Sequence, residues 1–219
     1  MFKRGRILGL LVFVVFSAGF FCGDASIVDG SSPFGIREHI SGYGLMDGMP
    51  AGAEYDFYRV AGRDYNDLCN EIYDPENGKG SLNVRENRRY AACATKHYSW
   101  NADVDRQSGS TRFKNVNVRL RTSILFPVWD MPQDADPAMA KKWDGFVRAL
   151  KTHEFGHAGI YSEMAADLKQ ELERLEAADE DALHLMADNA YKTFLGRVYA
   201  RDMEYEIATN HGKSQGATF

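Results

Sequence analysis

Two histidines four residues apart, His153 and His157, enclose Glu154, Phe155 and Gly156. On a helix, residues four apart lie one turn above each other with about 6 Å between their β-carbons, so both imidazoles can point at one metal ion. Zinc bound by imidazole nitrogens at about 2.0–2.1 Å fits this spacing. Glu154 directly follows the first histidine, where its carboxylate can take a proton from a zinc-activated water. The pattern predicts peptide-bond hydrolysis, with one Zn2+ per chain as the cofactor.

The identity of a third metal ligand is left open by this motif. A catalytic zinc site usually has three protein ligands and one water. The familiar extension with a third histidine six residues after the second is absent, because Glu163 stands there. Six residues turn a helix by about 240°, so Glu163 faces away from the two histidines. The remaining donors lie further along the chain: Asp179, Glu180, Asp181, His184, Glu204, Glu206 and His211.

A long helix is predicted to carry the two histidines. Asp136 followed by Pro137 is a strong helix start, since it combines a capping side chain with proline in the first turn. Apolar residues then recur every three or four positions as far as Leu175. A break at 177–181 separates this helix from a second one, for which Gly212 is a suitable terminator.

Strands are predicted upstream of the helices. Segment 54–60 is rich in aromatic residues, segment 90–100 has apolar residues at alternate positions, and segment 116–124 alternates more clearly until Pro127 stops it. Asp64 is placed to cap a short helix after the first strand. The predicted fold is α+β, a small antiparallel sheet followed by two long packed helices, the first of which carries the zinc-binding motif.

The first 25 residues read as a secretory signal peptide. Lys3, Arg4 and Arg6 precede an uncharged, mostly apolar run over 7–22. An uncleaved anchor formed by residues 7–23 is the alternative, because the run is long for a signal and short for a spanning helix. A cleaved signal predicts a periplasmic or secreted protein of the bacterial envelope. An uncleaved anchor predicts a protein held at the inner membrane by this segment alone.

The remaining chain divides into a loose leader (26–52), a metallopeptidase-like domain (53–212) and a tail (213–219). Cys69 and Cys93 remain after the signal, and an even pair in an oxidising compartment predicts one disulfide; two buried free thiols are the alternative.

Composition argues against two classes of protein, a wholly disordered chain and one that binds nucleic acid. The chain has 219 residues and is 44% hydrophobic, so it can bury a core and is not wholly disordered. Its 26 basic and 31 acidic residues give a net charge of −5. Such a chain has no general attraction to phosphate backbones, so nucleic acid is not an expected partner.

Segment 205–212, Tyr-Glu-Ile-Ala-Thr-Asn-His-Gly, resembles the closing motif of a bacterial family of predicted secreted zinc-dependent proteases, catalogued mainly as a domain of unknown function. In that family Tyr-Asp-x-x-Thr-x-His-Gly follows a His-Glu-x-Gly-His helix. The resemblance implies His211 as the third zinc ligand and Tyr205 as a group that stabilises the oxyanion. Glu206 replaces the family's aspartate, and its longer side chain is easier to accommodate as a carboxylate that orients an imidazole than as a ligand.

The sequence therefore predicts a zinc-dependent metallopeptidase, a hydrolase that cuts a peptide or protein substrate in the cell envelope with Glu154 as general base. A non-catalytic envelope scaffold or binding module with a structural zinc is one alternative. A zinc amidase acting on peptidoglycan is another, since it uses the same water chemistry. The presence of Glu154 favours an enzyme, because a structural site needs ligands but no base.

Overall fold

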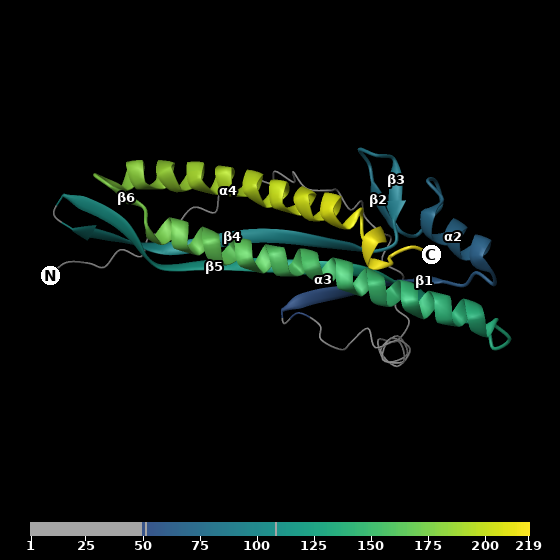
Figure 1. Ribbon diagram of the computed structural model, residues 1–219. Coiled ribbons are helices and arrows are strands. Elements are labelled where there is room, and N and C mark those ends of the chain that lie inside the picture. Colours follow the sequence, from purple (N-terminus) through teal and green to yellow (C-terminus); the bar gives the residue numbers. More distant parts are fainter. Residues whose placement is uncertain (1–49, 51, 108) are drawn as a thin grey trace.

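The computed structural model describes residues 50, 52–107 and 109–219, so the predicted signal and nearly all of the predicted leader lie outside the described residues. A long, narrow sheet lies beside two long helices, α3 (Pro137–Glu173) and α4 (Glu180–Thr209), that run along its length (Figure 1). This confirms the α+β class and the order of sheet first and helices second. No helix in the described part of the chain is long and apolar enough to cross a membrane.

The sheet is built on one long antiparallel hairpin, β4 (Cys93–Gln107) and β5 (Ser110–Trp129). Strand β1 (Ala53–Val60) runs parallel to the second half of β5, and the short β6 (Glu176–Ala177) pairs antiparallel with its beginning. The sheet is therefore mixed rather than purely antiparallel as predicted. A parallel pair needs a long connection, and the chain between β1 and β5 supplies one that contains a helix and three strands.

Two predicted strand boundaries differ from the structure. Segment 90–100 divides into β3 (Arg88–Tyr90), which pairs with β2 (Ser81–Asn83) in a separate small hairpin, and the start of β4. Strand β5 continues through Pro127 instead of stopping there. Its pairing with β4 ends at Leu125, so Pro127 has only β1 beside it among the described strands. Proline is tolerated at such an edge because one side of the strand needs no N–H donor.

The predicted starts of the first two helices are confirmed. In α2 (Tyr65–Tyr73) the carboxylate of Asp64 accepts a hydrogen bond from the backbone of Asp67. In α3 (Pro137–Glu173) Asp136 caps the first turn through the backbone N–H of Ala138. Both caps satisfy backbone donors that a helix leaves free at its beginning.

Helix α4 (Glu180–Thr209) begins at the predicted break, where Asp179 caps the N–H of Ala182. It ends because Asn210, His211 and Gly212 all take positive φ angles, of 50°, 54° and 75°. Left-handed residues terminate a helix and turn the chain away from its axis. The chain then forms a short 3-10 turn, η1 (Lys213–Gln215).

The core consists of two clusters arranged along α3. The first joins the beginning of α3 to β1 and the end of β5, and it contains Trp129 and Trp143. The second joins the end of α3 to α4 and the β4–β5 hairpin, and it contains Leu168 and Phe194. The two histidines lie on α3 at the junction of these clusters, so packing on both sides holds their backbone in place.

The predicted disulfide between Cys69 and Cys93 is wrong, because Cys69 carries a free thiol. The Cys69 side chain faces the core from α2 and interacts with the hydroxyl of Tyr65 one turn earlier. Cys93 instead begins β4, where it lies opposite Leu125. The spacing of the cysteines along the sequence does not show whether they lie close enough in the fold to form a disulfide.

Candidate metal centre

Three donor side chains converge between the two long helices. His153 and His157 come from α3 and Glu206 from the last turns of α4, and their donor atoms all lie within 4.8 Å of one another. The two Nε2 atoms are 3.3 Å apart. The Glu206 carboxylate lies 3.2 Å from Nε2 of His157 and 3.6 Å from Nε2 of His153. This group could hold a metal ion.

Hydrogen bonds on the far side of each ring fix the tautomers. Nδ1 of His157 lies 2.8 Å from a carboxylate oxygen of Asp202, and Nδ1 of His153 lies 3.0 Å from the amide oxygen of Gln215. Both acceptors lack a proton, so each Nδ1 carries one and each Nε2 presents a lone pair to the centre. Two lone pairs and a carboxylate that face one point repel each other unless a cation or a proton lies between them. The donor set therefore fits a metal ion.

The charges around these donors favour a positive species. Burial opposes a charge on His157, but hydrogen bonds to Asp202 and Glu206 outweigh it and raise the pKa of His157 to about 10. Burial also acts to raise the pKa of Glu206, and the two imidazoles outweigh it and lower that pKa well below its usual range. Without a metal the centre thus holds a proton on His157.

Glu154 is buried beside the donor group without belonging to it. Its side chain is on α3, and its carboxylate accepts a hydrogen bond from the backbone of Ala94 in β4. Burial raises the pKa of Glu154, and electrostatic interaction with His157 and His153 limits the rise. A carboxyl group of raised pKa that is not a ligand can accept and return a proton.

Tyr205 lies against α3, and its ring contacts both imidazoles. Its ring stacks on His153 with 5.3 Å between centroids. Its hydroxyl donates to the backbone carbonyl of His153 at 3.1 Å and accepts from the Gln215 amide at 3.2 Å. The Tyr205 hydroxyl thus donates its proton to the backbone of α3. In this arrangement it supports His153 and is not free to donate to an oxyanion.

His211 does not join the converging donors. Its Nδ1 lies 3.0 Å from the Glu206 carboxylate, and its ring packs on Tyr90 of β3. Glu206 is still in the helical turn that faces α3, whereas His211 follows the left-handed turn at the end of α4. The structure thus brings together His153, His157 and Glu206, and it places His211 on the outer side of Glu206.

The other donors that the sequence left open are also remote from the centre. Asp179, Glu180, Asp181 and His184 lie at the opposite end of α4. Glu204 is exposed and pairs with Arg201.

Residues 55–212 match the family described as "Bacterial protein of unknown function (DUF922)". The chain belongs to this DUF922 family. The matched range contains the three donors, Glu154 and His211. No curated protein and no solved structure matches the chain. The family description assigns no activity, so the function of this DUF922 protein has to be argued from its site.

Sequence reasoning missed Asp202 and Gln215 as the partners of the two histidines. Asp202 had a readable signal, because Phe194 and Val198 belong to the buried stripe of α4 and Asp202 is the next residue at the same spacing. A charged residue at a buried position of a helix needs a polar partner. Gln215 had no such signal, since it lies beyond the DUF922 match in the predicted tail.

The predicted tail of this DUF922 protein packs onto the domain. Phe219 is 9% exposed and belongs to the first core cluster, and its backbone oxygen accepts a hydrogen bond of 2.7 Å from Tyr65. Gln215 is therefore held close to His153 by a segment anchored on both sides.

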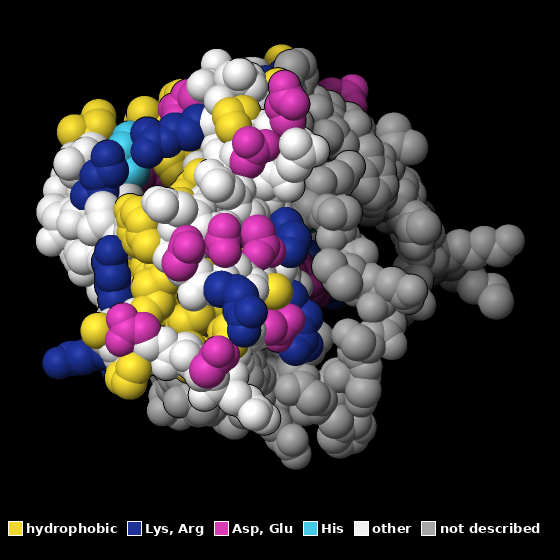
Figure 2. Space-filling view, turned by 90° about the vertical axis from the view of Figure 1, so that its right-hand side faces the viewer, with side chains coloured by type: hydrophobic (Ala, Val, Ile, Leu, Met, Phe, Trp, Pro, Cys, Tyr) yellow, Lys and Arg dark blue, Asp and Glu magenta, His cyan; other side chains and the backbone are white. Residues whose placement is uncertain are grey.

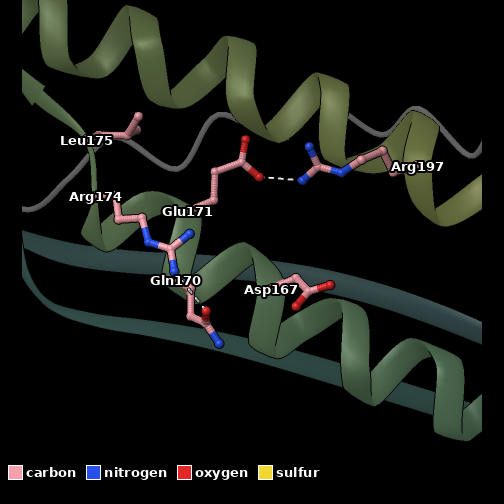
Figure 3. A pocket seen from close by; sticks show the side chains of 6 residues that line it. All are labelled: Asp167, Gln170, Glu171, Arg174, Leu175 and Arg197. Atoms are coloured by element: carbon pink, nitrogen blue, oxygen red, sulfur yellow. Dashed lines mark hydrogen bonds and ion pairs between the residues drawn. The ribbon is translucent and has the colours of Figure 1, made fainter.

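A hollow between α3 and α4 lies apart from this centre (Figure 3). Glu171 and Arg197 face each other across it as an ion pair, and Asp167, Gln170, Arg174 and Leu175 complete its lining. Asp167 is ten residues beyond His157, or about 15 Å along the helix. The hollow offers neither imidazole nor thiol, and the described residues give it no evident chemistry.

The end of the molecule near α2 carries acidic and basic side chains interspersed with apolar ones (Figure 2). A nucleic-acid interface would instead present a predominantly basic face. The described side chains on this face thus carry charges of both signs.

Proposed function

We propose that this protein is a zinc-dependent peptidase in which His153, His157 and Glu206 hold one zinc ion and Glu154 is the general base. The observation that carries the proposal is the convergence of two oriented imidazoles and one carboxylate beside a buried carboxyl group that is not a ligand. Two histidines and a glutamate form a ligand set that catalytic zinc sites use, with the fourth position left for water.

The spacing of the donors is compatible with zinc. Two ligand atoms at 2.0–2.1 Å from a tetrahedral ion lie about 3.3–3.4 Å apart. The two Nε2 atoms are 3.3 Å apart. One Glu206 oxygen lies 3.2 Å from Nε2 of His157, and the other oxygen lies 3.6 Å from Nε2 of His153. A change in the orientation of the Glu206 carboxylate would bring one of its oxygens to the ion.

When bound, zinc would polarise a substrate carbonyl and lower the pKa of water toward about 7. Glu154 would take the proton of the attacking water and pass it to the leaving amine, a transfer that its raised pKa favours. The backbone N–H of Ala94 would hold the Glu154 carboxylate in place throughout. Asp202 and Gln215 would keep both imidazole lone pairs on the ion.

We further propose that the enzyme works in the bacterial cell envelope on a peptide or protein. The support for this location is the signal-like sequence of residues 1–25. Hydrolysis of the peptide cross-links of peptidoglycan would use the same site chemistry, so substrate profiling has to include both classes.

The decisive experiment compares wild-type protein with Glu154→Gln and with a control, Glu163→Gln, which changes an exposed residue of the same helix. Zinc content after dialysis and hydrolysis of a fluorogenic peptide library and of purified peptidoglycan are measured for all three. We expect about one zinc per chain in each protein, and hydrolysis in the wild type and the control only.

Each contrary result has its own meaning. Full hydrolysis by Glu154→Gln would show that Glu154 is not the general base. Zinc binding without hydrolysis of either substrate class would favour a scaffold with a structural zinc. Cleavage confined to peptidoglycan would indicate that the protein is an amidase and not a general peptidase.

A further inference from the structure

Lys96 is a buried lysine that nothing in the proposed reaction uses. It lies in β4, and only 14% of its side chain is exposed. Along this strand Ala94, Tyr98 and Trp100 alternate with exposed residues and pack against the helices. Lys96 occupies the same face between them. A lysine at a core-facing position of a strand is costly unless its charge has a partner.

The partner of Lys96 is the carboxylate that orients His157. The Nζ atom lies 2.7 Å from one oxygen of Asp202, whose other oxygen lies 2.8 Å from Nδ1 of His157. Only 4% of the Asp202 side chain is exposed, so water cannot replace either interaction. Lys96 also lies 3.4 Å from the hydroxyl of Tyr161 and 4.6 Å from its ring centroid.

We infer that Lys96 is a positioning residue, which fixes Asp202 so that His157 keeps its Nε2 lone pair directed at the metal. This inference rests on the proposed metal site. Because Lys96 binds one Asp202 oxygen and His157 the other, rotation of this carboxylate would break both interactions, and this favours the observed orientation of the imidazole. Mutation of groups that orient metal ligands typically weakens metal binding by about 10- to 100-fold.

The charges of the centre support the same role. Glu154, Asp202 and Glu206 are three largely buried carboxylates. A divalent ion would balance two of their charges, and Lys96 supplies the third positive charge without occupying a ligand position. The sheet thereby contributes to a site whose ligands all come from helices: Ala94 holds the base, and Lys96 holds the carboxylate behind His157.

The test measures zinc affinity by competition with a chelator of known affinity, for wild-type protein, Lys96→Met and Lys96→Arg. The control is Lys114→Met, which removes an exposed lysine paired with Asp105 on the same hairpin. We expect Lys96→Met to bind zinc about 10- to 100-fold more weakly. Lys96→Arg should recover part of the loss because it keeps the charge, and the control should bind like the wild type.

The direction of the change is informative, because removing the positive charge of Lys96 relieves its Coulomb repulsion of the metal ion, and this effect alone should tighten zinc binding. Equal or tighter zinc binding by Lys96→Met would therefore overturn the inference. In an Asp202→Asn background, Lys96→Met should add little further loss if Lys96 acts through Asp202, and an additive loss would also overturn it.

A second readout keeps the test independent of the proposed function. The 15N chemical shifts of His157 in metal-free protein report the protonation and the hydrogen bonding of its two ring nitrogens. They should change in Lys96→Met and stay unchanged in Lys114→Met, even if the wild type binds no zinc. Failure of the wild type to bind zinc would count against the proposed function, whereas unchanged His157 shifts in a folded Lys96→Met would count against the role of Lys96.

Discussion

The hydroxyl end of Tyr205 occupies the space where a side chain of Gly156 would begin. A β-carbon added to Gly156 would overlap the Tyr205 hydroxyl and its ring carbon Cζ. The glycine between the two histidines is therefore required by the close approach of α4 to α3. It is not simply a tolerated interruption of the helix.

Gly156→Ala should for this reason destabilise the protein by about 1–3 kcal/mol, as overpacking of a filled interior does. Gly159→Ala is the matched control, because Gly159 is on the same helix and nothing lies within 4 Å of its added β-carbon. Alanine there should stabilise the helix by up to about 1 kcal/mol. Chemical denaturation of both variants measures the difference. Equal effects would show that Tyr205 does not fill this space.

The sequence predicted those site residues whose positions follow from the pattern of a single helix. His153, Glu154 and His157 lie on a helix whose capping residue and apolar periodicity can be recognised in one continuous segment of sequence. Their placement could therefore be predicted. The choice between Glu206 and His211 depended on where α4 turns, and that is set by left-handed residues at 210–212. Gly212 marked the end of α4 in the sequence, but residue spacing did not show that Glu206 rather than His211 would face α3.

The pairing of Lys96 with Asp202 shows what a sequence reading could have recovered. Each residue is a charge at a core-facing position of its own element, one on a strand and one on a helix. Two core-facing charged residues of opposite sign in one small domain can be predicted to form an ion pair with each other. No sequence pattern predicted the parallel pairing of β1 with β5 or the contact of Gln215 with His153. Both depend on how segments far apart in the sequence pack together.

Glu206 and His211 can be told apart as metal ligands by single substitutions. Glu206→Ala should weaken zinc binding by more than about 100-fold, beyond the usual range for groups behind a ligand. His211→Ala should cost about 10-fold or less, because His211 touches only the outer side of Glu206. Glu204→Ala, at an exposed position of the same helix, is the control. Loss of zinc from His211→Ala with retention in Glu206→Ala would restore the ligand set implied by the family motif.

Phe219 should contribute to stability as a core residue although it lies in the predicted tail. It packs against Trp143, Phe146 and Tyr65. Phe219→Ala should lower the free energy of unfolding by about 3 kcal/mol, at the low end for a buried phenylalanine because 9% of it is exposed. Thr218→Ala, at the exposed neighbouring position, should have little effect. Urea denaturation tests the pair, and a Phe219→Ala protein as stable as the wild type would show that this segment is not part of the core.

The pH dependence of metal binding follows from the proton on His157. The pKa of His157 is raised to about 10 in the metal-free protein, above the value of about 6.5 expected in the unfolded chain. This group therefore stabilises the metal-free fold fully below about pH 6.5, and the contribution is lost as the pH rises toward 10. Zinc has to displace the same proton, so its affinity should increase over this range. Calorimetric titrations at pH 8 in buffers of different ionisation enthalpy should show at least one proton released per zinc bound. Binding without any proton release would mean that His157 is already neutral in the metal-free protein, and that Asp202 and Glu206 do not hold a proton on it.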